Sequence, residues 1–324
     1  MQTRRYLWST ALIAIVLIAS GALGGCAPAR QAPGEPIRLR LALLPILDTL
    51  PMYVAEQEGL FESNGVQVEF IPVASAPERD QVIAAGQADG MINEVVSTMF
   101  SNKASTQVQI VRYARVATTD QALFRILASG NSEINAVEDL KGVEIGISEG
   151  TVIAYLTDRL LQAEGFSADE IQTVAVPKIP DRLALLGTGE LKAAMLPEPL
   201  SSLAEFQGAR LVLDDTRHPE YSFSTIAFRK AVIDAQPEAI RGFLAALEQA
   251  VGLINADPAR WNSLLGEKNL VPEPLLATYQ VPTFVAAGVP TQAQWDDTLE
   301  WARQANLIDQ DVSYQDSVTD QYLP

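Results

Sequence analysis

Short apolar runs alternate with amphipathic stretches along most of this chain, and this alternation decides its fold class. The apolar runs have the length of strands, and the amphipathic stretches have the period of helices, which is typical of βαβ units. The sequence therefore predicts an α/β fold with strands at 37–44, 66–73, 90–92, 108–116, 123–128, 143–147, 173–176, 193–196, 211–213 and 224–228.

Helical patterns fill the intervals between these strands and dominate the last part of the chain. The early helices are expected at 51–61, 77–85, 95–102, 152–163, 180–186 and 201–206. After Lys230 the helical pattern is broken by prolines, with no clear strand before Val312 and helices expected at 237–254, 258–265, 274–279 and 292–305. A β/α part followed by a helical tail predicts two lobes, with the tail covering the first.

The N-terminus has the layout of an export signal. Arg4 and Arg5 precede an apolar run at 7–23, which is shorter than the ~20 residues of a spanning helix and ends in LGGC at 23–26. This ending resembles a bacterial lipoprotein signal, which implies cleavage before Cys26 and acylation of that residue. We expect a signal peptide at 1–25, a lipidated tether at 26–36 and anchoring on the extracytoplasmic face of the cell membrane. The alternative is an ordinary secretory signal with a chance cysteine.

Composition excludes several kinds of partner and chemistry. The chain has 40 acidic and 23 basic side chains, a net charge of −17, and such a surface repels nucleic acid. Cys26 is the only cysteine and His218 the only histidine, so no intramolecular disulfide or cysteine metal site is expected. We expect no metal and no cofactor, and the composition favours a binding protein over an enzyme. Without residues 1–25 the chain is long enough for two domains, at roughly 150 residues each.

Several segments carry a family resemblance. Residues 44–61 read LPILDTLPMYVAEQEGLF, and NGVQV follows at 64–68. Further matches are AGQADG at 85–90, DLKG at 139–142 and LPEPL at 196–200. In this order and spacing, the region from about Ile37 to Phe228 resembles the SsuA/THI5-like solute-binding proteins, the sulfonate, nitrate and thiamine-pyrimidine type that serves ABC importers.

The resemblance implies a two-lobed type II periplasmic-binding-protein fold, each lobe a mainly parallel sheet flanked by helices. It places lobe one at 37–119 and 223–324 and lobe two at 120–222, with hinge strands near 118–122 and 222–225. A ligand that contacts both lobes only in the closed state shifts the population toward that state. The implied partners are an ABC permease and its ATPase, with the chain itself expected to be a monomer.

Candidate ligand contacts follow from the rule that ligands lie beyond the carboxyl ends of strands, where helices begin. Four loops qualify and each holds an acidic residue; with their polar neighbours, the candidates are Asp48, Thr49, Asn93, Glu94, Ser148, Glu149, Thr151 and Glu198. The alternative is that these side chains only cap helices.

The acidic loops bear on ligand charge. If the acids face the ligand unpaired, they repel a sulfonate or nitrate, and no Lys or Arg lies in the loops, although Arg112, Arg115 or Arg125 could approach from strands. The loops therefore favour a neutral or cationic nitrogen heterocycle, such as a thiamine pyrimidine or another vitamin-like ring. A sulfonate or nitrate is the alternative. Tyr53 and Tyr155 could stack on a flat ring, or could be core residues at helical spacing.

Two other functional classes compete with transport. Gly146-Ile-Ser148-Glu-Gly150 matches the G-x-S-x-G nucleophile elbow of hydrolases, which would need His218 as base and Asp214 or Asp215 as acid. These acids are too close to His218 in the chain to orient its ring from a separate loop. The THI5-like name also covers enzymes that make a pyrimidine, but the cysteine-rich motif and the histidine expected of those enzymes are absent from this sequence. The second competing class is a ligand-sensing lipoprotein. Such a sensor would usually be fused to a membrane helix and a signalling segment. We therefore favour a lipoprotein that delivers its ligand to an importer over one that senses it.

Overall fold

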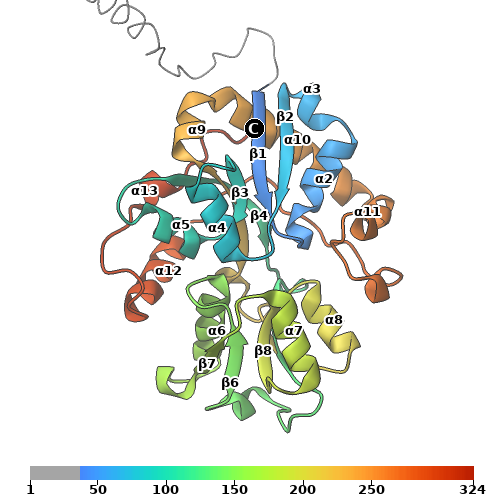
Figure 1. The fold of residues 1–324 in the computed structure, drawn as a ribbon, viewed down its shortest axis with the longest axis vertical. Helices are drawn as coiled ribbons and strands as arrows, with labels where there is room; N and C mark the ends of the chain where they lie inside the picture. Colours follow the sequence, from blue (N-terminus) through green and yellow to red (C-terminus); the bar gives the residue numbers. More distant parts are fainter. Residues whose placement is uncertain (1–36) are drawn as a thin grey trace, which may run out of the picture. The chain divides into compact units, whose positions relative to one another are not determined.

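Two five-stranded sheets organise the computed structural model, which describes residues 37–324 (Figure 1). Sheet one has the order β2-β1-β3-β10-β4 and consists of β1 (Ile37–Leu43), β2 (Val66–Pro72), β3 (Gly90–Asn93), β4 (Val108–Val116) and β10 (Phe223–Arg229). Sheet two has the order β7-β6-β8-β5-β9 and consists of β5 (Phe124–Ala128), β6 (Glu144–Ile147), β7 (Gln172–Ala175), β8 (Ala193–Pro197) and β9 (Arg210–Asp214). All ten predicted strands are confirmed, each to within one residue at either end.

The α/β class is confirmed, but each sheet is mixed rather than mainly parallel. In sheet one, β1 is parallel to β2 and β3, whereas β10 is antiparallel to β3 and β4. In sheet two, β6 is parallel to β7 and β8, whereas β5 is antiparallel to β8 and β9. The antiparallel strands β5 and β10 are those on which the chain enters one sheet from the other.

Helices pack on both sheets where the sequence predicts them. Sheet one has α2 (Leu50–Gln57), α3 (Leu60–Ser63), α4 (Ala76–Ala84) and α5 (Val95–Asn102), and sheet two has α6 (Val152–Ala163), α7 (Ile179–Thr188) and α8 (Leu200–Phe206). The expected helix at 51–61 is split because Gly59, at φ 66°, takes a left-handed conformation that glycine adopts without strain. Short 3-10 turns lie at Leu47–Thr49, Val137–Leu140, Ala168–Glu170, Pro219–Tyr221, Pro258–Trp261 and Glu273–Leu275.

The tail is helical and returns to sheet one. It forms α9 (Lys230–Ala235), α10 (Pro237–Ala256), α11 (Asn262–Glu267), α12 (Gln292–Gln304) and α13 (Tyr314–Ser317). Helix α10 packs on α2 and α3, with the rings of Phe61 and Phe243 stacked at 5.4 Å. The helix expected at 274–279 is wrong: only the 3-10 turn forms there, and the following residues up to Pro290 are irregular.

Helix α12 contacts helices of both sheets, α5 and α6. On the sheet-one side, the Tyr113 hydroxyl of β4 donates to Gln294 Oε1 at 2.7 Å. On the sheet-two side, the Tyr155 hydroxyl and Arg159 Nε of α6 donate to Asp297 Oδ2 at 2.7 and 3.0 Å. One helix of the tail therefore joins the two sheets.

The chain itself crosses between the sheets twice, from β4 to β5 and from β9 to β10. The hinge strand expected at 118–122 is wrong, because these residues form a tight turn closed by one bridge between Thr118 and Gln121. The stretch expected at 222–225 belongs mostly to β10 and thus to sheet one.

A buried carboxylate ties the two crossings together. Asp215 accepts hydrogen bonds from the backbone N–H groups of Leu123 at 3.0 Å and Phe124 at 2.9 Å, and from the Ser222 hydroxyl. The Ala117 N–H also donates to the Ser222 carbonyl at 2.9 Å. These bonds hold the entry to sheet two beside the exit from it.

The predicted signal peptide, the lipidation of Cys26 and the tether lie outside the described residues. Across residues 37–324, none of the helices combines the length and the apolar character needed to cross a membrane.

Candidate functional site

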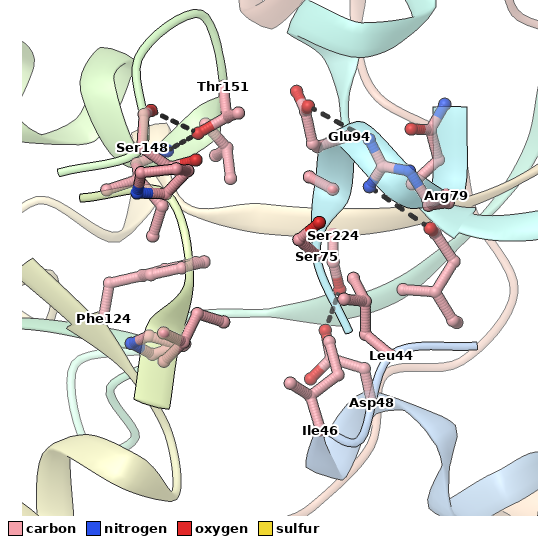
Figure 2. A pocket seen from close by; sticks show the side chains of 18 of the residues that line it. Leu44, Ile46, Asp48, Ser75, Arg79, Glu94, Phe124, Ser148, Thr151 and Ser224 are labelled. Atoms are coloured by element: carbon pink, nitrogen blue, oxygen red, sulfur yellow. Dashed lines mark hydrogen bonds and ion pairs between the residues drawn. The ribbon is translucent and has the colours of Figure 1, made fainter. Parts of the chain in front are cut away.

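A cavity of about 80 Å³ is lined by residues of both sheets (Figure 2). In Figure 2, Ser148, Thr151 and Phe124 of sheet two face Glu94, Arg79 and Asp48 of sheet one. Much of the wall is apolar, from Leu44, Ile46, Ile92, Phe124, Val152, Ile153, Pro177, Ile179, Pro197 and Phe223. At ~10–15 Å³ for each water-sized group, the cavity suits a small organic ligand.

Four helices begin at this cavity. Ser75 caps α4 by accepting from the Glu78 N–H, Glu94 caps α5 by accepting from the Ser97 N–H, and Thr151 caps α6 by accepting from the Ile153 N–H. Helix α7 starts here with no side-chain cap. Each start adds partial positive charge and backbone donors, so the cap interpretation is confirmed for Glu94 and Thr151 without removing them from the cavity wall.

The structure divides the ten candidate residues into two groups of five. Those that line the cavity are Asp48, Asn93, Glu94, Ser148 and Thr151. Those that do not are Thr49, Tyr53, Glu149, Tyr155 and Glu198. Thr49 stands at the N-cap of α2, but its hydroxyl donates back to the Ile46 carbonyl at 2.8 Å and caps no N–H.

Both tyrosines pack away from the cavity. Tyr53 lies edge-on to Phe70 at 5.1 Å, with Lys268 Nζ 4.7 Å from the centre of its ring. Tyr155 is buried, edge-on to Trp301 at 5.5 Å. The aromatic rings that line the cavity are instead Phe124 and Phe223.

Of the four loop acids, only Asp48 and Glu94 line the cavity, and Asp48 is paired. Asp48 lies 3.3 Å from Arg115 Nη1 and accepts from the Ser224 hydroxyl. Glu198 forms an ion pair with Arg125, and Glu149 is exposed outside the cavity. The arginines come from β4 and β5, far from the acids in sequence, so the loops alone did not reveal the pairing.

The fourth acid, Glu94, is buried and lies in a cluster with the buried Arg79 and the partly exposed Asp80 of α4. Arg79 Nη2 lies 2.8 Å from Asp80 Oδ1 and 3.6 Å from Glu94 Oε1. Burial raises the pKa of Glu94 to about 7, opposed by Arg79 and reinforced by Asp80. Sequence analysis missed Arg79, although it lines the cavity.

Arg182 of α7 was also missed, and it differs from every other charged group of the cavity. Its side chain has no exposed surface, and Nη1 donates to the Val176 carbonyl at 2.9 Å. Nε and Nη2 have no hydrogen-bond partner, and among residues 37–324 no carboxylate lies within 4.0 Å of the guanidinium. Burial lowers its pKa to about 10, so the group stays charged at neutral pH.

A signal for both arginines was present in the sequence. Arg79 follows Pro77-Glu78 and Arg182 follows Pro180-Asp181, so each is the fourth residue of a helix that begins with X-Pro-acid-Arg. The two helices follow β2 and β7, which occupy the same edge position in the two strand orders.

The hydrolase triad does not form. Ser148 lines the cavity, but His218 Nε2 lies 3.2 Å from Glu164 Oε1, and Asp215 binds the crossing segments. No hydrogen bond joins Ser148 to His218 in the part of the chain that the structure describes.

Two mixed sheets that share one cavity define a bilobal α/β binding-protein fold. Consistent with this, the structure is similar to the alkanesulfonate-binding protein SsuA of Xanthomonas axonopodis pv. citri bound to MOPS. The TM-score is 0.73 at 20% identity, over 88% of this chain and 99% of that one. The chain belongs to the NMT1/THI5-like family, whose model matches residues 47–260.

Two relatives carry names that refer to binding. A Brucella abortus protein named only as a binding protein is 25% identical over 210 residues, which is 63% of each chain, so the match spans less than two thirds of its length. An Escherichia coli protein named as binding aliphatic sulfonates is 24% identical over 268 residues, 82% of each chain.

Proposed function

We propose that this chain is the extracytoplasmic solute-binding component of an ABC importer. Its family, its fold and a small cavity lined from both sheets support a binding role. In this proposal Cys26 is lipidated, the protein is a monomer held at the membrane surface, and it delivers its ligand to a permease and ATPase. The lobes are 37–119 with 223–324, and 120–222, and they close by bending at the two crossings held by Asp215.

The observation that supports our proposal for the ligand class is the unpaired guanidinium of Arg182. A buried charge without a partner costs several kcal/mol, and a bound anion would supply that partner through charge-assisted hydrogen bonds. The uncapped start of α7 adds donors of the same sign nearby. Because Asp48 and Glu198 are paired with arginines and Glu149 lies outside the cavity, only Glu94 remains of the four acids that favoured a neutral or cationic heterocycle. We infer a small ligand with an anionic group, which favours the sulfonate or nitrate alternative.

The test is calorimetric titration of a fragment starting at Ala27, which contains the compact unit 36–324. The ligands are ethanesulfonate, nitrate and 4-aminopyrimidine. We expect an anion to bind and Arg182→Met to weaken it about 100-fold, since losing one partner of a buried charge pair costs ~2–5 kcal/mol. Arg217→Met, at a half-exposed arginine outside the cavity, is the control and should change nothing. Binding of aminopyrimidine alone, or unchanged anion binding by Arg182→Met, would overturn the assignment.

A further inference from the structure

Opposite Arg182, the sheet-one wall presents buried oxygen atoms that lack donors. Asn93 Oδ1 and Glu94 Oε1 have no hydrogen-bond partner, and these residues are only 1% and 3% exposed. Both line the cavity. Arg79 Nη2 on the same wall also has no hydrogen-bond partner, so this wall has one spare donor beside its two spare acceptors, whereas Arg182 has spare donors only.

The orientation of the Asn93 amide follows from its neighbours. Its Nδ2 donates to Thr98 Oγ1 at 2.9 Å, while the Thr98 hydroxyl donates its own hydrogen to the Glu94 carbonyl at 3.1 Å. Thr98 can therefore only accept from Asn93, which leaves Oδ1 as the free atom.

Glu94 uses only one carboxylate oxygen. Oε2 accepts from the Ser97 N–H at 3.1 Å, whereas Oε1 has only Arg79 Nη2 at 3.6 Å, too far for a hydrogen bond. Arg79 is already engaged by Asp80 at 2.8 Å. With two acids to one arginine, this wall has an excess negative charge when Glu94 is ionised, while the sheet-two wall has the excess positive charge of Arg182.

We propose that the ligand is a short bipolar molecule, with an acid group paired to Arg182 and a protonated amine that donates to Asn93 Oδ1 and Glu94 Oε1. The inference rests on the proposed function and narrows its ligand class. The cavity is small, at about 80 Å³, so we expect a short spacer between the two ends. The apolar side chains of Ile92, Phe124 and Phe223 would contact those carbons.

The test compares ligands that differ only by the amine, on the unmodified fragment from Ala27. Titration with 2-aminoethanesulfonate against ethanesulfonate, and with 3-aminopropanoate against propanoate, also separates sulfonate from carboxylate as the acid group. We expect the amine to improve the affinity at least 10-fold in one of the two pairs. Equal affinity within both pairs would overturn the bipolar ligand and leave the proposed function intact. If none of the four acids binds but nitrate does, the bipolar ligand is overturned and the anionic ligand class stands. If nitrate also fails to bind, the anionic ligand class is overturned as well.

A substitution at Glu94 tests whether the amine of the ligand binds there. Glu94→Gln keeps an oxygen that can cap α5 but removes the charge, so we expect the gain from the amine to fall to threefold or less. Asp120→Asn, at an exposed acid in the turn between the sheets, is the matched control and should keep the full gain. An undiminished gain in Glu94→Gln would overturn the placement of the amine.

Discussion

Arg79 and Arg182 occupy equivalent positions in the two halves of the cavity, yet their surroundings differ. Both are fully buried, and each is the fourth residue of a helix that begins with proline in its second position. Arg79 is followed by Asp80 and lies near Glu94, whereas Arg182 is followed by Leu183 and has no carboxylate within 4.0 Å in residues 37–324. The same local motif therefore gives an arginine with carboxylates beside it in one sheet and, within residues 37–324, an arginine with no carboxylate beside it in the other.

The acid of sheet two that corresponds to Glu94 is paired with a different arginine. Glu198 follows β8 as Glu94 follows β3, but it is bound by Arg125 on β5 and by the Ser201 and Ser202 hydroxyls at 2.8 Å. On the equivalent strand β10, Ser224 stands where β5 has Arg125, each directly after a phenylalanine that lines the cavity. Sheet two therefore pairs this acid with an arginine of β5, whereas the acid of sheet one lies beside Arg79 of α4.

The largest effect on this difference between the sheets should come from removing Arg125, the ion-pair partner of Glu198. We expect Arg125→Met to lower the free energy of unfolding by about 3–5 kcal/mol, because removing one partner of a buried ion pair leaves the other charge unpaired. Urea denaturation of the ligand-free protein measures it. Arg303→Met, which breaks an exposed pair with Asp311, should cost less than 1 kcal/mol. Equal losses in the two variants would contradict a structural role for Arg125.

A carboxylate introduced beside Arg182, as Asp80 stands beside Arg79, should neutralise the charge of Arg182. Leu183→Asp places a carboxylate next to Arg182 as Asp80 stands next to Arg79, and we expect anion affinity to fall about 100-fold, or ~2.7 kcal/mol. Leu183→Asn has the same shape without the charge and serves as the control for lost packing. If both variants bind alike, the charge of Arg182 does not govern binding.

The raised pKa of Glu94 predicts the direction in which the stability of the protein changes with pH. Because the folded state holds this proton up to about pH 7 and the unfolded state loses it near 4.5, the contribution of Glu94 to stability falls as pH rises from 4.5 to 7. The full shift corresponds to about 3–4 kcal/mol at ~1.4 kcal/mol for each pKa unit, and about 2–3 kcal/mol of it falls between pH 4.5 and 7, because the carboxyl is half-titrated at each end of that interval. Asp215, whose pKa burial raises to about 6, contributes in the same direction. The measurement is therefore the difference in pH slope between the wild type and Glu94→Gln; identical slopes would place the pKa of Glu94 near its ordinary value.

The smallest expected effect concerns Tyr155, a side chain of sheet two that does not line the cavity. Tyr155→Phe removes the hydrogen bond to Asp297, so we expect about 1 kcal/mol of lost stability by thermal unfolding. Ligand affinity should stay within twofold of the wild type. A large loss of affinity with unchanged stability would restore the stacking interpretation.

The sequence predicted the fold better than the chemistry of the site, for a physical reason. Strands such as β4 and β8 are continuous apolar runs, so local composition locates them. The strand-end rule also brought Asn93, Glu94 and Ser148 to one cavity. The pairing of Asp48 with Arg115 and of Glu198 with Arg125 joins positions far apart in the chain, and only the folded chain brings them together. Arg79 and Arg182 were detectable through their shared X-Pro-acid-Arg helix starts, a repetition that sequence analysis overlooked.

Helix α12 has a mechanical consequence for any movement between the sheets. Two adjacent chain crossings alone would let one sheet twist as well as bend relative to the other. A third attachment, from Tyr113 through α12 to Tyr155 and Arg159, resists twisting as long as its hydrogen bonds hold. In the closure proposed above, this attachment favours rotation about a single axis, so the groups that face each other across the cavity would meet in the same positions each time the sheets approach.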